Sequence, residues 1–216
     1  MERVHGVTLA DEISKQGSLE LAEILRIGTQ LAAGLAAAHD QGVVHRDIKP
    51  ANIRLENGVQ RVKISDFGLA KATDDLNITR AGDVAGTPEY MSPEQAAGGP
   101  VDHRSDLFSL GSVLYAMCTG RSPFRADTAL AALARVRHDS PKPLAQANPD
   151  IPDWLSAVIQ RLLEKAPEDR YTSAEEVQQV LTDLLAHVQA PEHNARPVVV
   201  STPAAPADPV LIPSMA

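Results

Sequence analysis

One short loop, His45-Arg46-Asp47-Ile48-Lys49-Pro50-Ala51-Asn52, combines a carboxylate, an ammonium and an amide within eight residues. Asp47 can accept the proton of a hydroxyl group, and Lys49 can neutralise the charge of a phosphoryl group. Asn52 offers a neutral oxygen, which hard cations such as Mg²⁺ accept as a ligand. The combination favours phosphoryl transfer. The alternative is a charged surface turn that leads into a strand at residues 53–55.

Further motifs follow the loop in a fixed order. An Asn-Gly hairpin signal at 57–58 joins two strand-like segments, 53–55 and 62–64, and Asp66 follows at the end of the second segment, after Ser65. Two adjacent strands would bring Asp66 close to the polar side chains of the loop. Downstream lie Gly86-Thr87-Pro88-Glu89-Tyr90-Met91-Ser92-Pro93-Glu94 and Asp106-Leu107-Phe108-Ser109-Leu110-Gly111.

With these motifs in this order, the chain resembles the protein kinase family, specifically the eukaryotic-like serine/threonine kinases of bacteria. The resemblance implies a mainly α fold, the helical C-terminal lobe of a kinase over residues 7–188, in which a small β-hairpin carries the catalytic and metal-binding loops. Residues 1–6 would be the remnant of the hinge between the lobes, and the Pro- and Ala-rich residues 189–216 a disordered tail. The N-terminal lobe, with its glycine-rich phosphate loop, would be missing.

The resemblance assigns the chemistry to four residues. Asp47 would be the catalytic base, and Lys49 would contact the phosphates of ATP and neutralise the phosphoryl group. Asn52 and Asp66 would hold Mg²⁺ and so help to bind ATP. The implied substrates are proteins with serine or threonine hydroxyls.

Two threonines are implied to act in regulation and substrate selection. Thr79 lies in a polar segment, 70–86, that would be the activation loop, and it is the preferred phosphosite; its phosphate would pair with Arg46. An ordinary surface threonine is the alternative for Thr79. Thr87 would belong to the substrate loop and favour serine or threonine over tyrosine.

Three further charged residues are expected to be structural. Asp106, in a strongly apolar segment, needs hydrogen-bond donors, which by resemblance are backbone groups of the His45-Arg46 turn. Arg170 would pair with Glu94 and anchor the substrate-binding loop.

The apolar periodicity predicts five longer helices. Thr8 and Asp11 form a capping box for a short first helix that ends at Gly17, and Ser18 is expected to cap a longer helix over 19–39. A central helix is predicted at 105–119. The others are predicted near 128–138, 152–165 and 173–188, the last with a Ser173–Glu176 capping box.

Composition excludes some classes of protein. The net charge of −8 disfavours general binding to nucleic acid, and no unbroken apolar run approaches the length of a membrane span. Cys118 is the one cysteine, so no disulfide can form within the chain, and a reducing cytoplasm is expected.

Two functions of different kind remain open. The chain is either part of a serine/threonine kinase, weakly active or inactive unless an N-terminal lobe is supplied, or a non-catalytic kinase-like module that binds protein partners. Without the small lobe, the face near Val4, Leu55 and Phe67 is expected to be unusually apolar or mobile.

Overall fold

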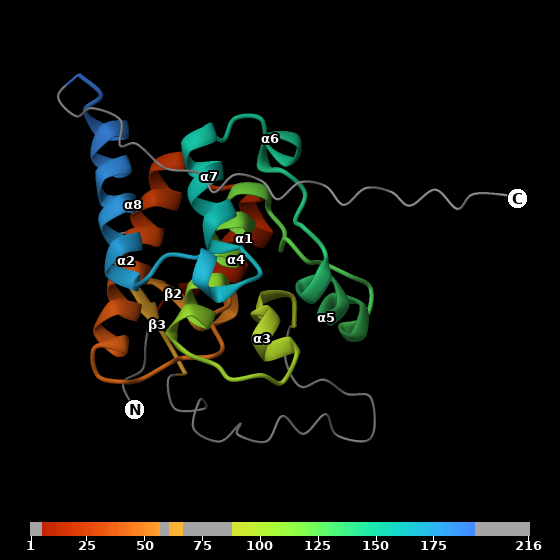
Figure 1. Cartoon of the computed structure of the whole chain (residues 1–216). Helices are drawn as coiled ribbons and strands as arrows, with labels where there is room; N and C mark the ends of the chain where they lie inside the picture. The colour runs from red at the N-terminus through yellow and green to blue at the C-terminus, as the bar shows by residue number, and fades with distance from the viewer. Residues whose placement is uncertain (1–5, 57–60, 67–87, 193–216) are drawn as a thin grey trace, which may run out of the picture.

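The computed structural model of the chain describes residues 6–56, 61–66 and 88–192. Its regular elements, in chain order, are β1 (Val7–Thr8), α1 (Leu9–Gln16), α2 (Leu21–His39), η1 (Pro50–Asn52), β2 (Ile53–Glu56), β3 (Arg61–Ile64), η3 (Pro88–Tyr90), α3 (Pro93–Ala96), α4 (His103–Thr119), α5 (Ala129–His138), α6 (Leu144–Ala147), α7 (Asp153–Leu162), η4 (Pro167–Asp169) and α8 (Ala174–Gln189). The fold is kinase-like and mainly helical, with one small sheet to the side of the helices (Figure 1).

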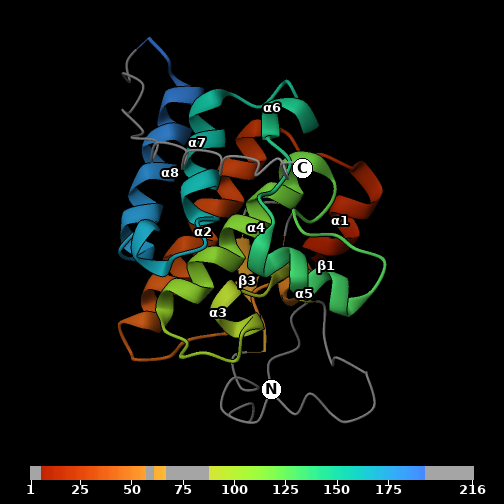
Figure 2. The same cartoon turned by 45° about the vertical axis from the view of Figure 1, so that its right-hand side comes forward.

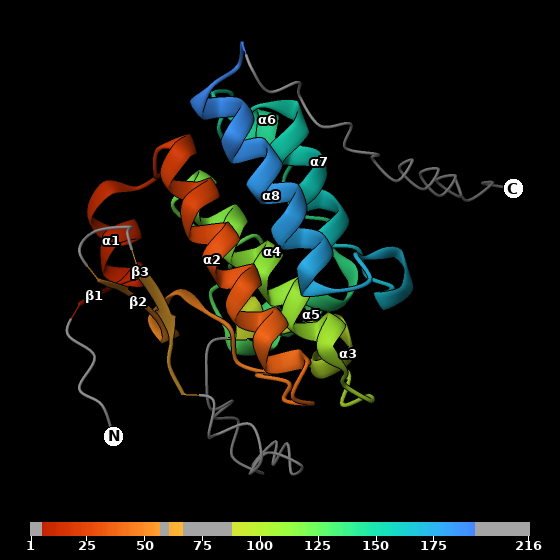
Figure 3. The ribbon, with the colours of Figure 1, turned by 90° about the vertical axis from the view of Figure 1, so that its left-hand side faces the viewer.

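Helix α4 is the centre of the core. Every residue from Ser105 to Cys118 is buried, which agrees with the predicted central helix of 105–119. Helices α2, α6 and α7 contact α4, and Figure 3 shows α2, α4, α7 and α8 side by side as one bundle. A helix that is buried on all sides must be apolar on most sides, as the α4 sequence is.

Helix α2 packs against α8 and α4 through buried residues that include Ile24, Leu31 and Leu35. This 19-residue helix, with a mean hydropathy of 1.2, is also long and apolar enough to cross a membrane. The sequence was searched only for unbroken apolar runs. Helix α2 contains polar residues between its apolar ones, so it was not recognised as a candidate span. Because a core helix meets the same criteria, length and composition alone are weak support for a span.

The sheet has three antiparallel strands in the order β1-β2-β3. The predicted hairpin is present, with Ile53 opposite Ile64 and Leu55 opposite Val62. The third strand was not predicted: β1 adds to the free edge of β2, with Val7 opposite Leu55. The Leu55 side chain is only 3% exposed, so the expected apolar face is not found at this residue, but its strand partner Val7 is 50% exposed. Val4 and Phe67, the other residues of that expectation, lie outside the described residues.

The structure corrects two predicted helix caps. Ser18 does not cap α2, which begins at Leu21, because the Leu19 amide donates to the Met117 carbonyl at 2.9 Å and Leu19 is buried. At α8 the Ser173 hydroxyl accepts from the Glu176 amide as predicted. The Glu176 carboxylate, however, accepts from the amide and hydroxyl of Thr172 at 2.8 Å, so the reciprocal bond of a capping box is not formed.

The other predicted caps are confirmed. At α1, Thr8 and Asp11 form both bonds of a capping box, and Gly17 ends the helix. Gly120 ends α4 in the left-handed conformation. Thr128 caps α5 (Ala129–His138), a cap that was not predicted, and the helix lies within the predicted range 128–138.

Candidate active site

Asp106 of α4 binds the backbone of the loop 45–49 through its carboxylate. Its two carboxylate oxygens accept from the backbone amides of His45 and Arg46, each at 2.8 Å, and the His39 ring lies 2.9 Å from the same carboxylate. Asp106 is fully buried, so each of these donors replaces a water molecule that the carboxylate gave up. These are the backbone donors that the sequence analysis expected for Asp106.

The backbone of the loop is unusual at Arg46, which has φ of 67°, a left-handed conformation that costs roughly 1–2 kcal/mol for a non-glycine residue. The surrounding bonds fix this conformation from both sides. The Arg46 amide donates to Asp106, and the Arg46 carbonyl accepts from the Gln95 side chain at 2.7 Å. Local strain of this kind is maintained only where the surrounding structure determines it, which is typical of functional sites.

The ring of His45 is buried and joins the loop to the end of β3. Its Nε2 donates to the Ser65 carbonyl at 2.9 Å, so its Nδ1 is the atom that accepts from the Asp47 amide at 3.2 Å. The contacts describe a ring that orients Asp47.

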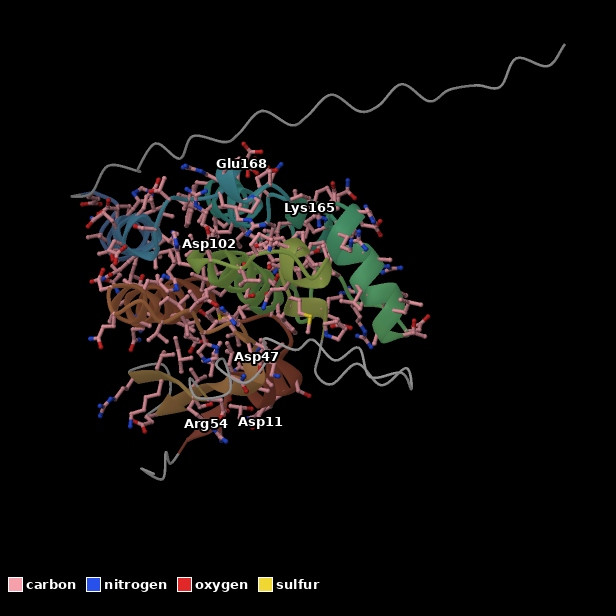
Figure 4. All side chains as sticks on the ribbon, turned by 60° about the horizontal axis from the view of Figure 1, so that its bottom comes forward. Asp11, Asp47, Arg54, Asp102, Lys165 and Glu168 are labelled. Carbon is pink, nitrogen blue, oxygen red and sulfur yellow. The ribbon has the colours of Figure 1, made fainter. Side chains whose placement is uncertain are left out.

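Asp47, Lys49 and Asn52 form one cluster. Lys49 Nζ lies 2.8 Å from Asp47 Oδ2, and Asn52 Nδ2 donates to the same oxygen at 2.9 Å and to the Asp47 carbonyl at 2.8 Å. Both side-chain contacts go to Oδ2, and the Asp47 side chain is 47% exposed. Among the described residues no side chain contacts the second oxygen, Oδ1, which leaves it for a hydroxyl that approaches from solvent. Figure 4 shows Asp47 between the sheet and the helices.

The oxygens of Asn52 and Asp66 fit a magnesium site. Because Asn52 Nδ2 points to Asp47, the amide oxygen faces away from it and is available as a ligand. The Ser65 amide donates to the Asn52 carbonyl at 2.8 Å, which places the next residue, Asp66, beside Asn52. Asp66 also has φ of 67°. One carboxylate, one amide and the phosphate oxygens of a nucleotide form the hard oxygen set that Mg²⁺ prefers.

The expected ion pair between Glu94 and Arg170 is present and bidentate, with contacts of 2.8 and 2.9 Å. Burial alone would raise the pKa of Glu94. The hydrogen bonds from Arg170 and Ser105 outweigh this effect and hold the pKa below its ordinary value. Glu94 lies in the short helix α3, so the pair ties α3 to the bundle.

The sequence was also compared with families of known proteins. The family model described as protein kinase domain matches residues 1–183. The chain belongs to the protein kinase family.

Relatives of this kinase chain are bacterial serine/threonine kinases. A probable serine/threonine-protein kinase of Clostridium acetobutylicum is 43% identical over 184 residues, which are 85% of this chain and 28% of the relative. A serine/threonine-protein kinase of Myxococcus xanthus is 41% identical, over 94% of this chain and 40% of the relative. PknB of Mycolicibacterium smegmatis is 39% identical, over 82% and 28%. The chain thus spans between 28% and 40% of the length of these relatives.

Some residues of the site were not found from the sequence. Gln95 and His39 both support the catalytic loop through contacts with Arg46 and Asp106. A local signal existed for Gln95, because Ser92 and Gln95 form a capping box at α3. No local signal existed for His39, which is 67 residues from its partner. Thr79 and Thr87 lie outside the described residues.

Proposed function

We propose that this chain carries the catalytic loop of a serine/threonine protein kinase, which transfers the γ-phosphoryl group of ATP to serine or threonine hydroxyls of proteins, and that the isolated chain is weakly active or inactive until an N-terminal kinase lobe is supplied. The observation that supports this most directly is the cluster of Asp47, Lys49 and Asn52 with Asp66 beside it. The family and the names of the relatives support the same activity.

In the proposed reaction Asp47 takes the proton of the substrate hydroxyl, and Oδ1 is the oxygen that has room for it. The hydroxyl oxygen then forms a bond to the γ-phosphorus while the bond from that phosphorus to the ADP oxygen breaks, and ADP leaves with the electron pair. Lys49 contributes positive charge next to the reacting group. Its contact with Asp47 holds it there before the substrate binds.

Asn52 and Asp66 would hold Mg²⁺, which supplies positive charge to the phosphate oxygens of the nucleotide. The role of Asn52 within the chain is to fix Asp47 through two hydrogen bonds from its amide nitrogen. The Asn52 side chain would therefore position the base Asp47 through its amide nitrogen and bind the metal through its amide oxygen.

We also propose that Thr79 is a phosphosite whose phosphate pairs with Arg46. Thr87 is proposed to belong to the substrate loop. We also propose that the protein lies in a reducing cytoplasm, because its one cysteine, Cys118, has no partner in the chain for a disulfide.

The test combines Mg-ATP binding, measured by calorimetry, with transfer of labelled phosphate to a Ser/Thr peptide. Asp47→Asn removes the base and keeps the shape, so transfer should fall by at least about 100-fold while Mg-ATP binding changes little. Asp66→Asn should weaken Mg-ATP binding. With an N-terminal kinase lobe supplied, peptide and Mg-ATP binding without transfer that depends on Asp47 would refute the enzyme and support the non-catalytic binding module.

A further inference from the structure

An open pocket of about 340 Å³ lies next to the proposed catalytic cluster. It is lined by residues of α1 (Ala10, Ile13, Ser14), of the catalytic loop (Lys49, Pro50, Ala51), of η3 (Tyr90) and of the end of α4 (Gly120, Arg121). Figure 2 shows the face on which α1, α4 and α5 are neighbours. The pocket therefore joins elements that are far apart in the sequence, with Lys49 shared between it and the cluster.

The charged side chains that line this pocket, among the described residues, are both cationic: Lys49 and Arg121. The two nearest carboxylates are already engaged. Asp47 contacts Lys49 at 2.8 Å, and Glu89 accepts from the Ser122 hydroxyl and from the Ala126 amide. Asp47 neutralises Lys49, whereas Arg121 forms no ion pair with another described residue, so Arg121 is the lining cation that is left for an anionic occupant.

The pocket also offers neutral donors over an apolar wall. The hydroxyl of Tyr90 has no hydrogen-bond partner among the described residues, and burial, then the nearby Glu89 carboxylate, raise the pKa of Tyr90 well above its ordinary value. Tyr90 therefore remains a neutral donor near physiological pH. The walls formed by Ala10, Ile13 and Pro50 suit the methylene groups of a side chain.

Backbone contacts hold Arg121 at the edge of the pocket. Gly120 has φ of 76°, and a Cβ atom there would lie 3.3 Å from the backbone of Gly17 at the end of α1. The Leu19 amide donates to the Met117 carbonyl at 2.9 Å and makes the same connection. These contacts place Arg121 next to α1 rather than leaving its position to a mobile loop.

We propose that this pocket is a specificity subsite for the protein substrate and that Arg121 selects a glutamate or aspartate close to the phosphoacceptor. The proposal rests on the proposed kinase function. The pocket begins about one lysine side chain away from Asp47, which an extended peptide covers in about two residues. Helix α5 packs against η3, the element that contributes Tyr90 to the pocket.

The test measures binding of Ser/Thr peptides by fluorescence anisotropy, with glutamate, alanine or lysine placed in turn at the positions on both sides of the phosphoacceptor. At one position near the phosphoacceptor, glutamate should bind about fivefold more tightly than alanine, the upper range for an exposed ion pair. Arg121→Glu should abolish this preference and favour lysine at the same position. Because peptide binding is measured without ATP, the result reports on the subsite and does not depend on phosphoryl transfer.

Arg125→Glu is the matched control, because Arg125 is exposed, lies outside the pocket lining and gives the same change in net charge. It should leave the glutamate preference in place. Peptide binding with no acidic preference, or a preference that survives Arg121→Glu, would refute the subsite while leaving the kinase function standing. Failure of every peptide to bind would refute both.

Discussion

The ion pair between Glu94 and Arg170 allows a quantitative prediction. The Arg170 side chain is 0% exposed, and all five of its N–H groups donate: two to the Glu94 carboxylate and three to the backbone carbonyls of Arg104, Glu164 and Lys165. The perturbation is Arg170→Met, which keeps most of the side-chain volume and removes all five donors. It leaves a carboxylate that is only 13% exposed without its cation.

The expected cost of Arg170→Met is about 4–5 kcal/mol, the upper part of the range for breaking a buried pair, because three carbonyls lose their donors as well. Glu94→Gln should cost less, about 2–3 kcal/mol, since three carbonyls still solvate the guanidinium of Arg170. The double variant should cost clearly less than the sum of the two, because neither charge is then left unpaired.

Urea unfolding at pH 7 measures these free energies, and Trp154, the one tryptophan of the chain, reports on the transition from the edge of the core. Glu94→Gln and the double variant keep the measurement possible if Arg170→Met does not fold. A cost below about 1 kcal/mol for Glu94→Gln, or strictly additive costs in the three variants, would refute the view that the two charges depend on each other.

The pH dependence follows from the lowered pKa of Glu94. Because the folded protein holds the carboxylate more strongly than the unfolded chain does, the stabilisation is present above the ordinary pKa of 4.5 and is lost as the pH falls through the folded value. The unfolding free energy of the wild type should therefore decrease more steeply below pH 4.5 than that of Glu94→Gln. Equal slopes would contradict this assignment.

Three further predictions concern the core and the catalytic loop. Asp106→Asn should cost about 2–3 kcal/mol and reduce phosphoryl transfer, because one amide oxygen replaces the two carboxylate oxygens that hold the loop; urea unfolding and the transfer assay measure both effects. Gly111→Ala should cost about 1–3 kcal/mol in urea unfolding, because the added Cβ would lie 2.7 Å from Cβ of Leu162. Burial lowers the pKa of Lys165 from 10.5 to about 8, so between these values the unfolded chain binds more protons and stability should rise with pH. The rise should be smaller in Lys165→Gln, and equal pH profiles would contradict the lowered pKa.

Local chemistry explains which elements were predictable. The caps of α1 and the hairpin of β2 and β3 depend on residues within a few positions of each other, and the structure contains them. The polar cluster of the loop 45–52 also lies within one segment, where short spacing limits how far its side chains can separate.

Contacts between distant segments explain what was missed. The strand β1 forms because the free edge of β2 pairs with it, which no pattern in two residues can show. The start of α2 shifts from Ser18 to Leu21 because Leu19 is held by Met117, about a hundred residues away in the sequence. His39 joins the support of the catalytic loop in the same way, through Asp106.

The amino-acid sequence by itself determined the family, the helices with strong periodicity and the chemical groups available for phosphoryl transfer, because these depend on residue types at short spacing. Only the tertiary structure decided that both side-chain contacts of Asp47 go to one carboxylate oxygen and that all five N–H groups of Arg170 donate hydrogen bonds. It also decided that Arg121 and Lys49 line the same pocket. The physical reason is that hydrogen-bond geometry and electrostatic fields depend on distances in space, which chain spacing does not determine for segments that are far apart.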